Sequence, residues 1–378
     1  MTATHLRRWA IQAVLLLAVG GLLFAAFANA RANLAARGIS TSFDFLNQTA
    51  GFGLNQSFIP YSPLSSYGRA LLVGLANTLV VSLLAGVFAT IIGFAAGFAR
   101  LSRNWALARL AGLYVETVRN IPLLLQLLFW YVAILSPLPG PTDSLHFAGV
   151  LLNNRGLILP GLVFSPGAAW VAGAAEAGVI LAFFWRRFAR KKLGAPVWPV
   201  AVLLLAIPPL IAFFAFGRPI GLDLPVFEPR VNRFNVEGGL RVPPEIFALV
   251  LALSLYTGSY IAEIVRAGVQ SVARGQSEAA AALGLNDAQT RKWVIVPQAM
   301  RIIMPPLISQ YLALTKNSSL AAFVGFADLM QVSGTILNQT GAAVQVIGLA
   351  MAIYLVLSVA TLLVLRLYER RFSWSAAR

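Results

Sequence analysis

The sequence has no cysteine and only two histidines, His5 and His146, among its 378 residues. The absence of cysteine excludes a disulfide framework and thiolate-bound metal ions, and two histidines do not favour a histidine metal centre. Charged residues make up only 11% of the chain, whereas hydrophobic residues make up 58%, and the mean hydropathy is +0.77. Soluble domains are usually about 45–50% apolar and about 25% charged. The composition therefore predicts an all-α, polytopic helical membrane protein.

The sequence also lacks the motifs of common catalytic and nucleotide sites. There is no Gly-x-Ser-x-Gly, no His-Glu-x-x-His and no clustered pair of carboxylates, so a membrane-embedded hydrolase is not indicated. A P-loop needs a lysine directly after a glycine. None of the four lysines follows a glycine. We therefore expect no enzyme activity and no bound cofactor in this chain, and any ATP that drives it must bind to another subunit.

Eight apolar segments approach or exceed the roughly 20 residues that a helix needs to cross the hydrocarbon core. We predict about eight transmembrane helices, at 10–28, 70–98, 111–135, 168–185, 197–216, 245–265, 302–325 and 343–365. The first segment precedes "ANA" at 28–30 and so resembles a secretory signal. Its apolar run from Trp9 to Phe27 exceeds the about 7–15 residues of a usual signal core, so we expect a retained anchor.

The basic residues indicate how the segments are oriented. A net charge of +16 is compatible with nucleic-acid binding, but the charges lie between apolar segments, where they orient a membrane protein; no nucleic-acid partner is expected. With the N-terminus in the cytoplasm, 19 of the 29 basic residues lie inside and 8 outside. Arg119 and Lys316 lie in or near spans. The bias predicts that both termini are cytoplasmic. The outside segments 37–68 and 217–244 are predicted to be ordered loops or short interfacial helices.

A polar stretch, "EAAAALGLNDAQTRKWVIVPQ" at 278–298, interrupts the apolar pattern on the predicted cytoplasmic side. Alanine favours a helix up to Leu283, and Gly284 is suited to a left-handed C-terminal cap. Asn286 fits an N-cap with Gln289 as its capping-box partner. Pro297 is predicted to stop the second helix or to bend the chain into the next span. The pattern predicts a short helix-turn-helix, which by itself is equally consistent with an ordinary helical loop.

Few charges lie within the predicted spans, and such charges usually face a bundle interior or water. Glu116 and Arg119, and Glu263 and Arg266, are spaced for local ion pairs near span ends. Lys316 stands in "LALTKNSSL". Asn77 and Thr78 are expected to bond to a neighbouring helix, and the glycines of "GFAAG" at 93–97 are expected to allow close helix packing. Pro122 is expected to kink the third span and free a carbonyl group towards the bundle.

The polar stretch resembles the EAA loop of bacterial ABC importer permeases. The matching residues are Glu278, Ala279, Ala280, Gly284, Val294, Val296 and Pro297, with valines where the family usually has Ile and Leu. The stretches 77–104, 114–131 and 256–272 resemble permeases for polar amino acids. More narrowly, "FLNQTAGFGLNQSFIPYSPLSSYGRALLVGLANTL" resembles the Q-type permease subunit of the general L-amino acid (Aap or Bzt) importer.

This resemblance implies the core of a type I ABC importer permease (MetI-like). It divides the chain into an anchor and periplasmic segment, 1–69, and a transmembrane domain, 70–371, whose core, 70–135 and 245–371, is interrupted by an inserted segment, 136–244, with two extra spans. It implies a bacterial inner-membrane location. It also implies four kinds of partner: an ABC ATPase dimer, a second homologous permease subunit, a periplasmic amino-acid-binding protein and the lipid bilayer.

The resemblance also suggests roles for individual residues. Glu278, Ala279, Ala280, Gly284 and Pro297 are implied to couple the permease to its ATPase. A substrate pathway is predicted at Tyr260, Glu263, Arg266 and Lys316, in which Glu263 binds the ammonium group of an amino acid; the alternative is a structural pair of Glu263 with Arg266. At the level of function, the alternative to an ATP-driven importer is a secondary transporter coupled to an ion gradient, which often shows inverted repeats. No such repeat is visible in the sequence.

Overall fold

The computed structural model describes residues 3–36, 42–192, 198–217, 220–225 and 236–373. The chain divides into two compact units. Unit 1 comprises Met1–Leu128 and Leu249–Arg378, and unit 2 comprises Phe129–Ala248. Each unit has its own core and is described separately below.

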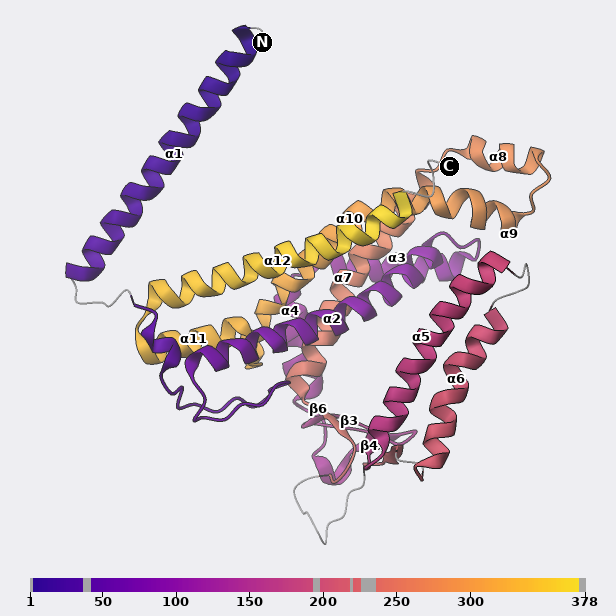
Figure 1. The fold of residues 1–378 in the computed structure, drawn as a ribbon, viewed down its shortest axis with the longest axis horizontal. Coiled ribbons are helices and arrows are strands. Elements are labelled where there is room, and N and C mark those ends of the chain that lie inside the picture. Colours follow the sequence, from indigo (N-terminus) through magenta and orange to yellow (C-terminus); the bar gives the residue numbers. More distant parts are fainter. Residues whose placement is uncertain (1–2, 37–41, 193–197, 218–219, 226–235, 374–378) are drawn as a thin grey trace. The chain divides into compact units, whose positions relative to one another are not determined.

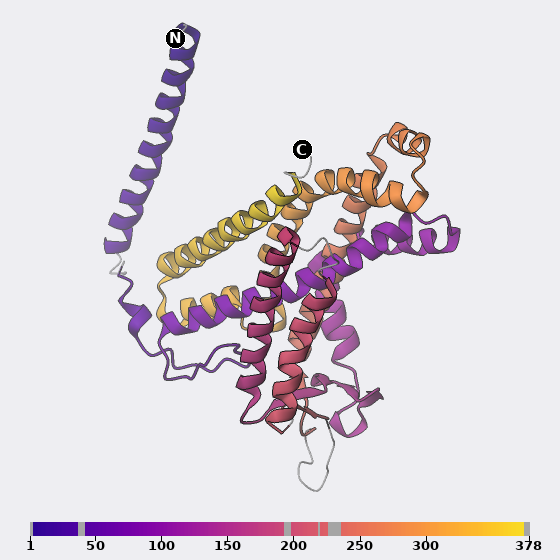
Figure 2. The ribbon, with the colours of Figure 1, turned by 45° about the vertical axis from the view of Figure 1, so that its right-hand side comes forward.

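The regular elements in the described part of unit 1 are helices, joined by loops. Its α-helices, with α7 beginning in unit 2, are α1 (Ala3–Ala36), α2 (Tyr67–Arg100), α3 (Trp105–Asn120), α4 (Leu123–Leu128), α7 (Pro244–Gln270), α8 (Arg274–Ala282), α9 (Asp287–Thr290), α10 (Val296–Asn317), α11 (Leu329–Thr340) and α12 (Ala343–Ser373). Three tighter or wider helical turns join them: η1 (Asp44–Asn47), the π-helical η4 (Arg291–Ile295) and η5 (Ser318–Val324). Helices α10 and α12 run side by side (Figure 1 and Figure 2), and both contact further helices of unit 1.

Small residues set the contact between α2 and α7. A Cβ atom added to Gly93 would lie 2.5 Å from the Cβ of Ile261, and one added to Gly97 would lie 2.8 Å from the Cβ of Val265. Only glycine allows the two helices to approach so closely, because any larger side chain would overlap its neighbour. This confirms the packing role predicted for "GFAAG".

Polar groups join α2 to the start of α11. The Asn77 amide donates to the Ala327 carbonyl at 2.7 Å, and the Thr78 hydroxyl accepts from the Leu329 backbone N–H at 3.1 Å. Both side chains are fully buried. Buried backbone groups need such partners where a helix is interrupted. The predicted bond to a neighbouring helix is confirmed for Thr78, which reaches Leu329 of α11, whereas Asn77 bonds to Ala327 in the turn before that helix.

The segment before α2 is an ordered loop, as predicted for 37–68, of which the structure describes residues from 42. Phe45 and Tyr67 are buried in one apolar cluster with Leu329 and Ile336 of α11. The Tyr61 hydroxyl donates to the Phe52 carbonyl at 2.9 Å. Aromatic burial therefore fastens this loop to the ends of α2 and α11.

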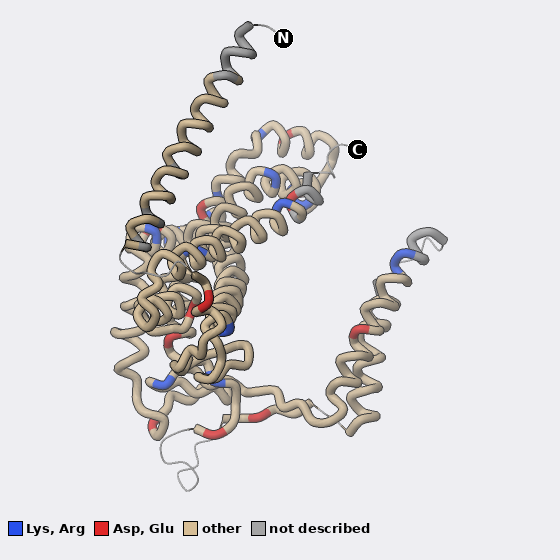
Figure 3. The backbone as a smooth tube through the Cα atoms, turned by 60° about the vertical axis from the view of Figure 1, so that its left-hand side comes forward, with Lys and Arg blue, Asp and Glu red and all other residues tan. Residues whose placement is uncertain are grey.

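All eight predicted spans contain helix, but their lengths differ. Four helices are long and apolar enough to cross a bilayer, at Tyr67–Arg100, Ala168–Arg187, Pro244–Gln270 and Ala343–Leu367. Two more spans are formed if each bent pair of helices counts as one, which gives up to six in the described residues. The shorter apolar helices Ile11–Ala26 and Val200–Ala215 fall at the two remaining predicted spans. Figure 3 shows long stretches of helix without charge, as a bilayer requires.

Pro122 does more than kink the third predicted span. Helix α3 ends at Asn120, α4 begins at Leu123, and the chain bends by 106° between α3 and the following helical stretch. A proline cannot donate the helical hydrogen bond, which frees carbonyl groups in the turn before it. The Gln126 amide donates to two of these carbonyls, those of Val118 at 2.8 Å and Ile121 at 2.9 Å. The break is therefore closed by a side chain from the next helix.

Unit 2 contains all six strands of the described residues. Its elements are the π-helical η2 (Phe129–Leu135), η3 (Pro141–Asp143), β1 (Leu145–Phe147), β2 (Val150–Asn153), β3 (Gly156–Leu159), β4 (Gly161–Phe164), α5 (Ala168–Lys192), α6 (Trp198–Ala215), β5 (Ile220–Asp223) and β6 (Leu240–Val242). The sheets have the antiparallel orders β1-β2-β3-β6 and β4-β5.

The strands correct one prediction about the segment 217–244. It was expected to form a loop or interfacial helices, but its described part supplies β5 and β6. Strands of three or four residues are too short to show a clear alternation, and each forms only because a distant strand pairs with it. Gly156 is required at the β2–β3 turn, since its φ is +113° and the Val242 carbonyl leaves no room for a Cβ. Residues 226–235 of this segment lie outside the described part.

Candidate functional site

Helices α8 and α9 form a helical hairpin, here called the α8–α9 hairpin (residues 274–290). It contains the first part of the stretch 278–298, whose remainder forms η4 and the start of α10. It lies at the N-terminal end of α10 (Figure 1). Gly284 has a φ of +76°, and its N–H bonds to the Ala281 carbonyl at 2.9 Å while the Leu285 N–H bonds to the Ala280 carbonyl at 3.1 Å. This pair of bonds is a Schellman motif. The predicted left-handed cap at Gly284 is confirmed.

The second helix of the hairpin begins as predicted. The Asn286 side chain accepts from the Gln289 N–H at 2.9 Å, and the Gln289 side chain accepts from the Asn286 N–H at 3.0 Å. These two bonds form a capping box, which satisfies two N–H groups that the helix start would otherwise leave free.

Pro297 does not stop this helix, which corrects one of the two predicted outcomes. Thr290, Arg291, Ile295 and Val296 have right-handed helical dihedral angles, and α9 passes through the π turn η4 into α10. The Val296 N–H bonds to the Arg291 carbonyl. A π turn widens the helix by one residue, so the missing N–H of Pro297 falls at the start of α10, where proline is tolerated.

The hairpin leaves most of its side chains uncovered. Glu278, Ala279 and Gly284 are exposed, whereas Ala280 is buried at 3% exposure. Two large apolar side chains at the hairpin, Leu283 and Trp293, are 81% and 58% exposed. Of the four matched EAA residues in the hairpin, Ala280 thus faces the hairpin interior, and Glu278, Ala279 and Gly284 are exposed.

A second group of charges surrounds Glu263. Its two carboxylate oxygens form close ion pairs with Arg100 of α2 and with Arg266 of α7. Arg119 of α3 approaches the same carboxylate at 4.0 Å and lies 4.9 Å from the centre of the Tyr260 ring. These residues are here called the Glu263 cluster: Arg100, Arg119, Tyr260, Glu263 and Arg266. One carboxylate thus connects three helices.

The local ion pairs predicted from spacing are half right. Glu263 and Arg266 pair as expected, which is the structural alternative to ammonium binding by Glu263. In the described residues, Glu116 forms no ion pair with Arg119 and is exposed. Arg119 instead turns to Tyr260 and Glu263, because the face of an aromatic ring and a carboxylate both attract a guanidinium group.

Lys316 does not join the Glu263 cluster through any contact in the described chain. It is exposed on the last turn of α10, directly before η5. Of the four predicted pathway residues, the structure therefore brings together Tyr260, Glu263 and Arg266. Their role in transport stays a prediction.

Sequence reasoning missed Arg100 and Gln126 as partners in this region. Arg100 had been assigned only to the cytoplasmic charge at the end of the second predicted span. Its position three residues after the close-packing Gly97 was the available signal, since that contact places the end of α2 beside α7. For Gln126 the available signal was its position one turn after Pro122, where an amide side chain can bond to the carbonyl groups that the proline leaves free.

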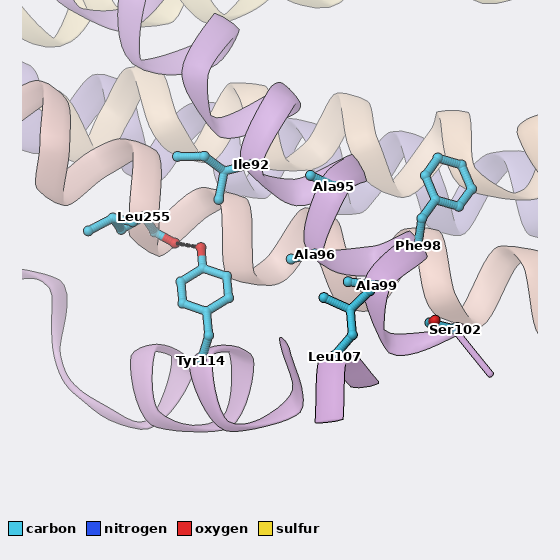
Figure 4. A pocket seen from close by; sticks show the side chains of 9 residues that line it. All are labelled: Ile92, Ala95, Ala96, Phe98, Ala99, Ser102, Leu107, Tyr114 and Leu255. Carbon is cyan, nitrogen blue, oxygen red and sulfur yellow. Dashed lines mark hydrogen bonds between the residues drawn. The ribbon is translucent and has the colours of Figure 1, made fainter. Parts of the chain in front are cut away.

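Two hollows border these helices in unit 1. An open apolar groove lies between α2, α3 and α7, where the Tyr114 hydroxyl donates to the Leu255 carbonyl at 2.7 Å (Figure 4). A cavity of about 510 Å³ lies between α2, α10 and α12 and has no charged lining residue. A zwitterion loses much free energy in such surroundings without charged partners. The Glu263 cluster is therefore the better candidate for contacting a charged solute.

Comparison with known proteins places the chain in a family. Residues 177–374 match the model of the binding-protein-dependent transport system inner membrane component. The chain is 46% identical over 353 residues to the general L-amino acid transport system permease protein AapQ of Rhizobium johnstonii, with 91% of this chain and 87% of AapQ covered. It is 44% identical over 374 residues to YhdX of Escherichia coli (strain K12), provisionally named as an amino-acid ABC transporter permease, with 97% and 94% covered.

A third relative has a name that specifies its substrates. The glutamate/glutamine/aspartate/asparagine transport system permease protein BztB of Rhodobacter capsulatus is 40% identical over 406 residues, with 97% of this chain and 94% of BztB covered. All three alignments extend well beyond the residues matched by the family model, and so include the hairpin, the Glu263 cluster and unit 2.

Proposed function

Because the chain belongs to the family of binding-protein-dependent transport system inner membrane components, we propose that it forms the translocation pathway of an ATP-driven importer of polar L-amino acids. It is a multi-pass membrane protein of a transporter permease family rather than an enzyme family. The proposed substrate class takes up the names of AapQ and BztB.

The α8–α9 hairpin is the proposed contact with an ATPase subunit. The observation that carries this proposal is the geometry of the matched EAA residues: Glu278 and Ala279 face outwards, and Gly284 holds the hairpin closed through its left-handed conformation. The exposed Leu283 side chain adds apolar surface at the tip, and apolar surface buried on contact favours association. Pro297 then places the start of α10 directly behind the contact.

The proposed assembly contains an ABC ATPase dimer, a second homologous permease subunit and a periplasmic amino-acid-binding protein. The chain would lie in a bacterial inner membrane with both termini in the cytoplasm. In this arrangement, 1–69 is an anchor with a periplasmic segment, and 70–371 is the permease domain with the insert 136–244. The grouping of Phe129–Ala248 into a compact unit of its own supports an insert close to these limits.

Reconstituted uptake tests the function directly. The complete complex is placed in proteoliposomes with the binding protein outside, and uptake of radiolabelled L-glutamine and L-glutamate is measured with ATP inside. We expect uptake to require ATP and to persist when proton and sodium gradients are collapsed. Uptake that follows a gradient and ignores ATP would instead establish the ion-coupled secondary transporter.

A further inference from the structure

The Glu263 cluster contains more positive than negative charge. Arg266 contacts both oxygens of Glu263, with its Nε donating to Oε2 at 3.3 Å, and Arg100 forms a second close pair with Oε2. Arg266 also donates to the Gln270 side chain at 2.5 Å. One carboxylate faces three guanidinium groups, so a positive charge of two remains. Such a surplus attracts an anion, and the partial burial of Arg100 and Arg266, which are 16% and 28% exposed, strengthens the attraction.

Of the three arginines in the Glu263 cluster, Arg119 is the one whose guanidinium N–H groups form no hydrogen bond with the described residues. Its NH1 lies 4.0 Å from Glu263 Oε2, which is beyond hydrogen-bond distance. No hydrogen bond joins its guanidinium group to any other residue that the structure describes. Its side chain is 38% exposed, whereas that of Arg100 is 16% exposed. A guanidinium group presents five N–H donors in a planar fork that matches the two oxygens of a carboxylate.

The Tyr260 ring positions the guanidinium group of Arg119 without occupying the N–H donors of that group. The guanidinium carbon lies 4.9 Å from the ring centre, and a cation–π contact of this kind does not occupy the N–H donors as a hydrogen bond would. The Tyr260 hydroxyl lies 3.2 Å from the Tyr256 hydroxyl, which fixes the ring. The fork is therefore oriented before any ligand arrives, and this lowers the entropy cost of binding.

Arg119 also lies at a break in a helix. It is on the last turn of α3, directly before the interruption at Ile121 and Pro122. Gln126 satisfies the carbonyls that the interruption frees, so the turn that carries Arg119 stays fixed. Interrupted membrane helices border the substrate sites of transporters, because a helix end brings polar groups to membrane depth without exposing them to lipid.

We propose that Arg119, supported by Tyr260, binds the carboxylate of the amino acid in transit, and that Glu263 is a positioning residue that neutralises Arg100 and Arg266 beside it. The assignment rests on the proposed function and specifies its substrate contact. It reverses the sequence-based expectation, in which Glu263 takes the ammonium group. Every amino acid carries the α-carboxylate, so one fork serves substrates with different side chains.

The test compares Arg119→Gln and Arg119→Lys with Arg109→Gln in the complete complex. Arg109 is a matched control because it lies exposed on the same helix and has no hydrogen bond or ion pair in the described chain. Binding of radiolabelled L-glutamine and L-glutamate to the detergent-purified complex is measured without ATP and without the binding protein. Uptake is measured separately in proteoliposomes, as KM and maximal rate.

We expect Arg119→Gln to weaken binding about 10- to 100-fold, the effect of losing charge-assisted hydrogen bonds, and to raise KM accordingly. Arg119→Lys keeps the charge but not the fork, so it should assemble normally and bind with intermediate affinity. Arg109→Gln should match the wild type in binding, in KM and in basal ATPase activity.

Unchanged binding and KM in an assembled Arg119→Gln or Arg119→Lys complex would overturn the assignment. So would failure of both variants to assemble, which would make Arg119 a structural residue. Substrate binding without any ATP-dependent uptake by the wild type would contradict the proposed importer while leaving Arg119 as the carboxylate site. Normal uptake by Arg119→Gln would contradict only the assignment of Arg119.

Discussion

The side-chain amide of Asn77 donates to the Ala327 carbonyl at 2.7 Å and so joins positions 250 residues apart in the chain. The same amide donates to the Gln56 carbonyl at 3.0 Å, and its oxygen accepts from the Phe58 N–H at 3.2 Å. One buried side chain therefore connects α2, the loop before it and the turn before α11. This turn, residues 325–328, is the break at which the chain bends by 52° between the helical stretch that ends at Val324 and α11.

Replacing Asn77 by alanine should destabilise unit 1. Three backbone groups would lose their partner, and each buried group left unsatisfied costs about 1–3 kcal/mol. We expect a loss of about 2–4 kcal/mol after partial rescue by water, measured as a lower midpoint of thermal inactivation in detergent. Asn47→Ala is the matched control, since Asn47 is exposed and should leave the midpoint unchanged. Equal midpoints for the two variants would contradict the role of Asn77.

Substitution of Gly93 by alanine should disturb the contact between α2 and α7. The added Cβ would meet Ile261 at 2.5 Å, so the helices must separate, at a cost of about 1–3 kcal/mol. Gly112→Ala on α3 is the control, because nothing lies within 4 Å of its added Cβ. We expect only the first variant to lose thermal stability. An equally stable Gly93→Ala protein would show that α2 and α7 do not pack at this distance.

The left-handed cap of the hairpin can be tested by Gly284→Val. A β-branched residue at a φ of +76° strains the backbone by roughly 1–2 kcal/mol, although there is open space around Gly284. We expect the variant to reach the membrane but to bind the ATPase subunit weakly and to transport slowly. Gly275→Val provides the control within α8, where φ is ordinary and space is also open. Gly284→Asn should retain most activity, because asparagine tolerates this conformation.

The charge balance of the Glu263 cluster gives a prediction about assembly. Glu263→Gln leaves Arg100 and Arg266 without their carboxylate, which should cost about 1–3 kcal/mol once partial exposure is allowed for. The double variant with Arg266→Gln should recover only part of this loss, since Arg100 also pairs with Glu263.

The triple variant with Arg100→Gln separates the two roles of Glu263. It should restore assembly, measured as the yield of intact complex. If it also restores uptake, Glu263 is not a substrate ligand. Restored assembly without uptake would support the ammonium-binding role predicted from the sequence.

The absence of cysteine allows a clean topology test. Single cysteines are introduced at Thr142 in unit 2 and at Ala288 in α9, both exposed positions. With the termini in the cytoplasm, a membrane-impermeant thiol reagent added to intact cells should label Thr142→Cys and not Ala288→Cys. Permeabilised cells should show labelling at both. The opposite pattern would reverse the orientation inferred from the basic residues.

The local features of the site were predictable because short-range chemistry determines them. Gly284, Asn286 and Gln289 form their caps through bonds that span only a few residues, and the glycines at 93–97 indicated close packing whatever the partner helix. The partner itself was not predictable, because Arg100 and Glu263 are 163 residues apart and nothing in either segment specifies the other. Arg119 was misassigned for the same reason: spacing suggested Glu116, but tertiary contacts offered a better-placed ring and carboxylate.

The strands of unit 2 show a related limit. Residues 156–159 have no periodicity that distinguishes a strand from a loop, and they form β3 only because β2 and β6 pair on either side. Pro297 is the opposite case. The rule that proline cannot donate a helical hydrogen bond applies there, but the helix continues past it. The π turn η4, which directly precedes α10, allows the helix to continue although Pro297 has no N–H to donate.

That π turn makes the hairpin mechanically asymmetric. On one side, residues 271–273 form a short non-helical joint to α7. On the other side of the hairpin, a continuous helical stretch runs from Asp287 to Val324. Its length is roughly 50–60 Å at about 1.5 Å per residue. A helix resists twisting and bending far more than a turn does. A torque applied to α9 would therefore be transmitted along this helical stretch, while the non-helical residues 271–273 would change conformation. A force applied to the hairpin would therefore act on η5 and on the bend before α11, at the other end of this helical stretch.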